Sequence, residues 1–279
     1  MSKALARLCS TAGHVSYRRI PAGLRLQSRS LSNVQQPFQP ERPSQPDSRP
    51  PYRGDFKKRK PPSAQSLQEL AEGLNARFKP LNFPPELAAR ILTHATHSNA
   101  YYFNSNRLSF IGRRVLQSYL LMFVHQSPAL RPDHDYEMIM ERTLNTRVLG
   151  RHVAPAWEFG ELIKWRPVTV GPLAHRPADD DIKRFIATLD PSTASTVGVH
   201  KVHGTSVEAL VGGVFHQFGG AIAHRLFHTR MLPHLLLPGQ SEGLHDAFHE
   251  DAHNIYLRMG GRLGDLAAPA RQNTATSEV

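Results

Sequence analysis

From Ser66 onward, apolar residues recur at the spacing of α-helices, and this pattern constrains the fold more than any other feature. No strand-like alternation persists along the chain. The helical patterns cover 66–78, 84–97, 104–125, 133–145, 179–189, 205–236 and 244–259. We therefore predict an all-α domain over residues 66–259, with the 104–125 segment as its central buried helix because it is apolar on most sides.

The first 60 residues differ from the rest in charge. They hold 13 Lys and Arg against 3 Asp and Glu, which leaves 21 against 20 for residues 61–279. Residues 1–36 have the Arg-rich, acid-free composition of a mitochondrial transit peptide, with cleavage expected near 30–33. A merely basic, disordered tail is the alternative. Cys9, the one cysteine, lies in this leader, so the folded part has no disulfide or cysteine zinc site.

Residues 37–65 form a Pro-rich basic arm that we expect to be disordered. It contains the run Lys57, Lys58, Arg59 and Lys60, which we expect to lie along RNA phosphates. A solvated run or a nuclear signal are the other interpretations. Residues 260–279 are predicted to be a flexible tail, and no apolar run reaches the roughly 18 residues of a membrane span.

Two motifs about 100 residues apart carry a family resemblance. The first is Asn106-Arg107-Leu108 followed by Phe110-Ile111-Gly112, and the second is Val207-Glu208-Ala209-Leu210. Together with segments 92–99 and 149–167, they resemble the signature helices of the ribonuclease III family, in matching order from Leu81 to Leu236. The resemblance implies a ribonuclease-III-like helical endonuclease fold.

The same resemblance implies where catalytic carboxylates would stand. Ribonuclease III enzymes use four carboxylates to hold divalent metal ions, two on each signature helix. The corresponding positions here are Ser109, Arg113, Thr205 and Glu208, so three of the four carboxylates are replaced. We therefore expect no catalysis, no metal and no other cofactor. Glu208 either pairs with Arg113 or is simply exposed.

A second motif also suggests metal chemistry. The sequence HEDAH, His249 to His253, fits the H-E-x-x-H zinc pattern. It has no evident third ligand downstream, so we interpret it as a polar helix face. His224, His228 and His234 recur beside Arg225 and Arg230, which favours a polar or RNA-facing helix side, and the two arginines are RNA-binding candidates.

The architecture suggests a ribosomal role. Only 20 residues follow Met259, fewer than the double-stranded-RNA-binding module of active ribonuclease III enzymes requires. With the leader, the chain is similar to the smaller ribonuclease-III-like components of fungal mitochondrial large ribosomal subunits. This implies a structural protein in the matrix that binds large-subunit rRNA and other ribosomal proteins. The alternatives are a truncated homologue that normally has the RNA module, and an RNA-processing enzyme or its inactive partner subunit.

The resemblance also implies a dimer interface. Ribonuclease III domains dimerise through an apolar face beside the first signature helix, here around Phe110, Leu116 and Tyr119. We expect a paralogous ribonuclease-III-like protein as heterodimer partner. The alternative is that these side chains fill the core of the domain.

Overall fold

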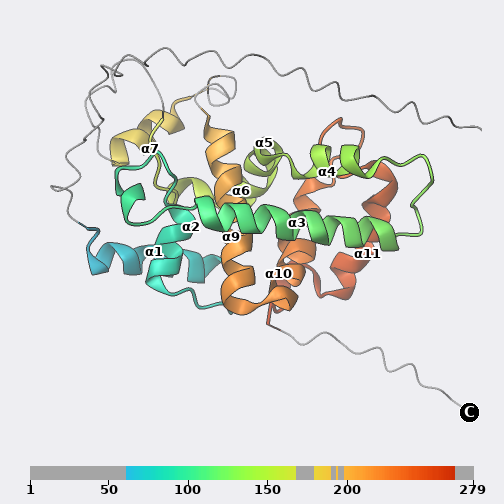
Figure 1. Ribbon diagram of the computed structural model, residues 1–279, viewed down its shortest axis with the longest axis horizontal. Coiled ribbons are helices and arrows are strands. Elements are labelled where there is room, and N and C mark those ends of the chain that lie inside the picture. The colour runs from blue at the N-terminus through green and yellow to red at the C-terminus, as the bar shows by residue number, and fades with distance from the viewer. Residues whose placement is uncertain (1–60, 168–178, 190–192, 194–197, 268–279) are drawn as a thin grey trace, which may run out of the picture. The chain divides into compact units, whose positions relative to one another are not determined.

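The computed structural model describes residues 61–167, 179–189, 193 and 198–267. These residues are mostly helical and contain no strand, which confirms the all-α prediction (Figure 1). The α-helices are α1 Ala64–Arg77, α2 Pro85–Leu92, α3 Asn106–Gln126, α4 Tyr136–Leu144, α5 Thr146–Val148, α6 Ala154–Ala156, α7 Asp179–Ala187, α9 Val199–Phe218, α10 Gly220–Leu226 and α11 His249–Arg258. The π-helical turns are η3 Leu149–Val153 and η6 Phe227–Met231, and the 3₁₀ turns are η2 Ser98–Tyr101, η4 Phe159–Glu161, η7 Leu232–Leu235, η8 Asp246–Phe248 and η9 Gly261–Leu263.

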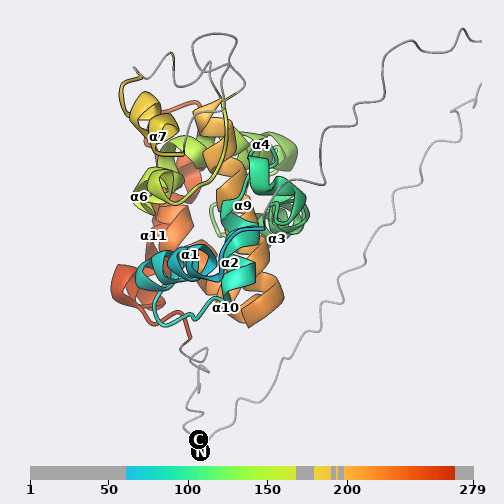
Figure 2. The same ribbon diagram turned by 90° about the vertical axis from the view of Figure 1, so that its left-hand side faces the viewer.

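The central buried helix is α9, and not α3 as the sequence predicted. Every residue from Ser206 to Val214 is buried, whereas α3 alternates between buried and exposed positions. The two helices cross, as Figure 2 shows with α3 nearly end-on beside the upright α9. Burial from several sides explains the run of small and β-branched residues in α9, because bulkier side chains would keep the neighbouring helices apart.

The N-terminal helices are fixed by local signals and by aromatic packing. Ser63 caps α1, its hydroxyl accepting from the Ser66 amide, so the folded part begins slightly before the predicted residue 66. Phe78, after α1, packs edge-to-face against Trp157 and Phe159, with ring centroids 5.2 Å and 6.0 Å away. These contacts join the start of the domain to the segment after α6.

The C-terminal part departs from the prediction in two ways. The helical pattern 205–236 is interrupted at Gly219, whose φ of +91° ends α9 and redirects the chain into α10. The prediction of a flexible tail from residue 260 is wrong for residues 260–267, because they include η9 and Leu266, which is only 1% exposed in the core. Burying this leucine orders the segment.

Several predicted regions lie outside the described residues: the leader 1–36, residues 37–60 of the Pro-rich arm with its basic run, and residues 268–279 of the tail. Among the helices that the structure describes, none is long and apolar enough to cross a membrane.

Candidate functional site

Two glycines bring the candidate site together. A Cβ at Gly112 on α3 would lie 1.8 Å from the Glu208 carbonyl oxygen, so only glycine allows α3 to approach α9 this closely. A Cβ at Gly204 on α9 would lie 1.7 Å from the Thr146 carbonyl oxygen, so α5 approaches α9 in the same way. The side chains of α3, α5 and α9 therefore meet around one point, Glu208.

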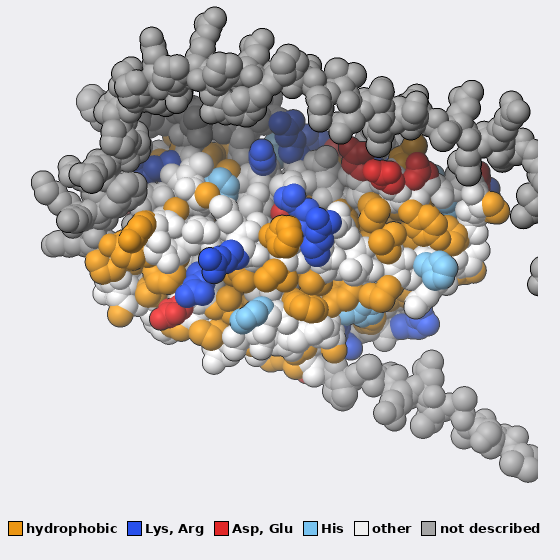
Figure 3. Space-filling model, viewed as in Figure 1, with side chains coloured by type: hydrophobic (Ala, Val, Ile, Leu, Met, Phe, Trp, Pro, Cys, Tyr) orange, Lys and Arg blue, Asp and Glu red, His pale blue; other side chains and the backbone are white. Residues whose placement is uncertain are grey.

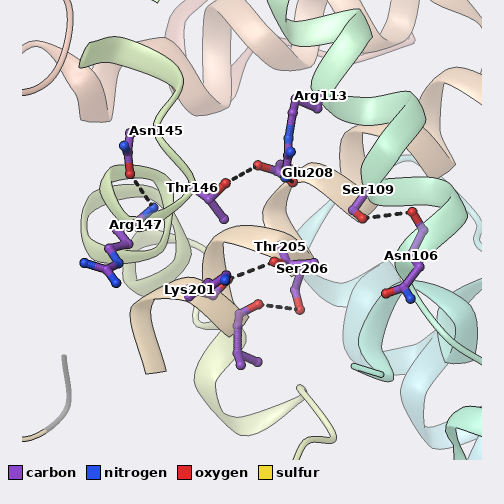
Figure 4. A network of polar contacts seen from close by, with 11 residues as sticks. Asn106, Ser109, Arg113, Asn145, Thr146, Arg147, Lys201, Thr205, Ser206 and Glu208 are labelled. Carbon is purple, nitrogen blue, oxygen red and sulfur yellow. Dashed lines mark hydrogen bonds and ion pairs between the residues drawn. The ribbon is translucent and has the colours of Figure 1, made fainter. Parts of the chain in front are cut away.

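Glu208 is a buried carboxylate with both oxygens engaged. Its side chain is 0% exposed. Arg113 Nη2 donates to Oε2 at 3.0 Å, and Thr146 Oγ1 donates to Oε1 at 2.7 Å (Figure 4). The structure therefore shows the pairing with Arg113 rather than simple exposure. The Arg113 side chain is 51% exposed, so one end of the pair is buried while the other meets solvent.

The two remaining family positions carry hydroxyls that turn back onto their own helices. Ser109 Oγ donates to the Asn106 carbonyl at 3.0 Å, and Thr205 Oγ1 donates to the Lys201 carbonyl at 2.9 Å (Figure 4). Such bonds satisfy the hydroxyl protons within the helix. The structure thus brings Arg113 and Glu208 into contact, while Ser109 and Thr205 bond to backbone carbonyls.

This donor set is poor in the ligands that a hard cation needs. Mg²⁺ and Mn²⁺ prefer several oxygen ligands, usually with carboxylates among them. Across the four positions the formal charge is zero, since Arg113 balances Glu208. In the described part of the chain, no group of three or more His, Cys, Asp or Glu side chains is placed to hold a metal ion.

Thr146 is the site residue that sequence reasoning missed. It lies just after Asn145, whose side chain accepts from the Arg147 amide and caps α5. Neither of the two signature motifs includes this segment, and a threonine after a capping asparagine is ordinary helix-start chemistry. Only the approach of α5 to α9 gives the hydroxyl its carboxylate partner.

The two arginines predicted to face RNA also form hydrogen bonds within the domain, and their role in RNA binding stays a prediction. Arg225 Nη2 donates to the Met259 carbonyl at 2.7 Å, and Arg230 Nη2 lies 3.4 Å from the Gly264 carbonyl oxygen. Both side chains are half-buried. They connect α10 and η6 to the segment after α11, where cations favourably meet the carbonyls at a helix end.

The histidines beside them differ in burial, and His224 and His234 are only half-buried. His228 is buried, with its ring centroid 4.6 Å from that of His224 and 4.8 Å from that of Phe227. Burial, and then the nearby His224 and Arg258, lower the pKa of His228 to about 3. On α9, burial and then His200 lower the pKa of His203 to about 4. Both rings are therefore neutral at pH 7.

The HEDAH segment forms the start of α11. His249 Nε2 donates to the Leu244 carbonyl at 3.0 Å, while His253 is exposed and its ring lies 6.1 Å from that of Tyr256. Asp251 accepts a hydrogen bond from the Ser127 hydroxyl at the end of α3. The segment thus connects α11 to α3, and its acids suit the positive end of the helix dipole.

The predicted dimer face is divided by the structure. Leu116 and Tyr119 belong to the core, with the Tyr119 hydroxyl donating to the Gly220 carbonyl at 2.8 Å. Phe110 points outward and is 63% exposed. The core interpretation therefore holds for two of the three residues, and Phe110 alone remains available at the surface.

Comparison with known proteins agrees with the motifs. A family model described as Ribonuclease-III-like matches residues 84–235, more than half of the 279 residues. Among solved structures, the chain is similar to the nuclease domain of ribonuclease III from Campylobacter jejuni, at 16% identity and a TM-score of 0.37. That similarity covers 55% of this chain and 87% of the other. No curated protein matches the sequence.

Proposed function

Because this chain belongs to the ribonuclease-III-like family, we propose that it is a non-catalytic structural constituent of the mitochondrial large ribosomal subunit. The observation that carries the proposal is the Arg113–Glu208 ion pair, which stands where the family places two metal-binding carboxylates. In this role, the helical domain provides a surface for rRNA and neighbouring ribosomal proteins.

Electrostatics supports the non-catalytic part of the proposal. A cation placed at Glu208 would have to displace the guanidinium of Arg113 and the hydroxyl of Thr146. At about 4 Å and an effective dielectric constant of about 20, each unit charge pair contributes roughly 4 kcal/mol. Three missing carboxylates and one added cation therefore remove most of the attraction that would draw a divalent ion out of water to this site.

The mitochondrial and RNA-binding parts rest on the sequence of residues 1–60. Their basic, acid-poor composition suits import into the matrix and attraction to phosphates, and the basic run 57–60 would contribute to the latter. Residues 61–279, which are nearly neutral in net charge, would then contact proteins as much as RNA. For the partner, we propose a paralogous ribonuclease-III-like ribosomal protein that covers the exposed Phe110.

The deciding experiment is co-sedimentation of the tagged full chain with mitochondrial ribosomal subunits. We expect it to stay with the large subunit after washing at high salt, because a structural component is held by many contacts. Release into the soluble fraction would favour an RNA-processing protein or its inactive partner subunit. A reporter fused to residues 1–32 should enter mitochondria in the same cells.

A cleavage assay tests the absence of catalysis directly. The chain without its leader should not cleave double-stranded RNA in Mg²⁺ or Mn²⁺ above a buffer blank. Activity that disappears in the Glu208→Gln variant would contradict the proposal, since it would show that Glu208 still serves catalysis. Activity that is unchanged in that variant would point to a contaminating nuclease.

A further inference from the structure

A cleft with a volume of about 1500 Å³ lies between the C-terminal end of α3, the α10–η6 segment and α11. We call it the α3–α11 cleft. Met122 and Phe123 line it from α3, and Ile255 and Leu257 line it from α11. Figure 3 shows histidine and basic side chains beside apolar ones below the C-terminal end of α3, and the largest acidic group lies over α4. Sites for drug-sized molecules usually measure roughly 300–1,000 Å³, so the cleft has room for such a ligand.

Two residues on the cleft walls each carry a buried nitrogen that has no hydrogen-bond partner among the described residues. The atoms are Nδ1 of His228 and Nε of Arg225. His228 is only 2% exposed, and the Arg225 guanidinium is held in place because its Nη2 donates to the Met259 carbonyl. A buried donor or acceptor without a partner destabilises the fold, and folded proteins contain few such groups. The two nitrogens therefore favour a ligand with hydrogen-bonding atoms of its own.

The formal charges on the cleft walls balance. The charged side chains that line the cleft are two arginines and two aspartates, namely Arg225, Arg258, Asp251 and Asp265. Burial lowers the pKa of His224, as it does that of His228, so both imidazoles are neutral at pH 7. A neutral imidazole offers one donor and one acceptor. The walls therefore suit a ligand whose buried part is uncharged and carries both kinds of hydrogen-bonding group.

We propose that the α3–α11 cleft binds an unpaired nucleotide, with its base inside the cleft and its phosphate at Arg258, which is exposed at the rim. A nucleobase is uncharged at pH 7, has two apolar faces and carries donors and acceptors along its edges. Its faces would pack against the apolar side chains of α3 and α11, and its edge would bond to Arg225 and His228. RNA loops and free nucleotides share this chemistry. The proposal deepens the proposed function, on which it rests for rRNA as the source of the nucleotide.

Three other ligands fit the cleft less well. A transition metal would need a third ligand besides His224 and His228, and within the described residues no group of three His, Cys, Asp or Glu side chains is placed to hold one. A small inorganic anion would meet Asp251 and Asp265 and would leave the apolar walls uncovered. Double-stranded RNA presents its bases paired and stacked, so it cannot insert one into a cleft. The cleft therefore favours an unpaired nucleotide.

The test crosslinks the purified full chain to a single-stranded RNA that contains 4-thiouridine and maps the crosslinked peptides by mass spectrometry. We expect crosslinks at residues 122–128 and 251–260, besides any at the basic run 57–60. Leu257→Glu should lower the yield at the cleft at least fivefold, because it places a negative charge beside the phosphate and removes an apolar contact. Its matched control, Leu263→Glu, makes the same change outside the cleft and should stay within twofold. The two leucines are 57% and 95% exposed, so both variants should fold.

Crosslinks only to the basic run would overturn the proposal, as would cleft crosslinks that Leu257→Glu leaves unchanged or that a duplex of the same sequence gives equally. Calorimetric titration with uridine monophosphate separates the two sources. Binding shows that a free nucleotide suffices, whereas cleft crosslinks without such binding identify RNA as the source. The ribosomal proposal is judged separately by co-sedimentation. Cleft crosslinks in a chain that leaves the large subunit at high salt would support the cleft and contradict the ribosomal role, whereas a chain that stays with the subunit but gives no cleft crosslinks would do the opposite.

Discussion

The inner and outer faces of α3 are only one helix diameter apart, yet they are constrained differently. On the inner face, Gly112 lies against the α9 backbone, and Ser109 and Leu116 are buried. On the outer face, Phe110 and Arg114 contact mainly each other and solvent. The inner residues are therefore set by packing within this chain, whereas the outer residues are free to suit a partner.

This difference explains which parts of the family pattern the sequence matches. The glycine and apolar positions of the first motif are present because they hold α3 against α9. Of the four positions that the resemblance aligns with catalytic carboxylates, Glu208 alone has a carboxylate side chain, and Arg113 and Thr146 stabilise it. The fold thus depends on the helix crossing and not on the metal ligands.

The largest effect is expected from filling the helix crossing. In the Gly112→Ala variant, the added methyl group would lie 1.8 Å from a backbone oxygen of α9, so the two helices must move apart. We expect a loss of at least ~4 kcal/mol in the free energy of unfolding, measured by urea denaturation. The control is Gly160→Ala, where the nearest atom is 3.6 Å away and the loss should stay below about 1 kcal/mol. Equal losses in the two variants would show that the close approach is not what stabilises the fold.

The buried ion pair should respond unequally to removal of its two ends. The Arg113→Met variant leaves a buried charge on Glu208 with only the Thr146 hydroxyl, and should lose about 3 kcal/mol. The Glu208→Gln variant leaves Arg113, which is half-exposed and can be hydrated, so it should lose about 1 kcal/mol. Urea denaturation of both variants at pH 7 measures the difference. A larger loss for Glu208→Gln would contradict this asymmetry.

Acid should lower the free energy of unfolding of the domain, because two of its histidines are buried in neutral form. His228 packs 5.7 Å from Phe123 of α3, and its folded pKa of about 3, like the value of about 4 for His203, lies below the unfolded value of 6.5. Between these values the unfolded chain binds more protons, so stability is lost as the pH falls below about 6.5. From pH 7 to pH 5.5 the two histidines should together remove roughly 2.5 kcal/mol.

Variants identify the groups responsible for that pH dependence. His228→Phe should reduce the change in unfolding free energy between pH 7 and pH 5.5 by roughly 1.2 kcal/mol, half of the contribution of the two histidines, because one titrating group is gone. An unaltered pH profile in His228→Phe would assign the effect to other groups.

The sequence predicted the helical class and, to within about three residues, the starts of α1 to α4, because capping and periodicity are local. Asp135, for example, accepts from two amides at the start of α4. It could not predict which side of α3 faces the core, since apolar residues occur on most sides of that helix. Leu116 and Tyr119 were therefore placed with Phe110, although they point to opposite faces.

The polar contacts of the site were predictable only where two motifs converge. The resemblance placed Arg113 and Glu208 in the same candidate site. Their pairing was therefore one of the two outcomes expected for Glu208. The Thr146 contact with Glu208 depends on long-range packing between helices, as do the hydrogen bonds from Arg225 and Arg230 to backbone carbonyls. Composition and spacing carry no signal for such contacts, because an arginine on a helix has the same local pattern whether it meets RNA or a backbone carbonyl.

The smallest effect is expected from charge reversal on the outer face, which sharpens the comparison with the inner one. Arg107→Glu with Arg114→Glu removes the cation–π contact with Phe110, a loss of about 0.5 kcal/mol at an exposed site. It also places an acid in the first turn of α3, where the helix dipole favours it by roughly 0.3 kcal/mol. The net change in unfolding free energy should therefore stay below about 0.5 kcal/mol, measured by urea denaturation of the full chain beside Arg131→Glu with Arg262→Glu. A loss above about 2 kcal/mol would mean that this exposed face of α3 contributes to folding.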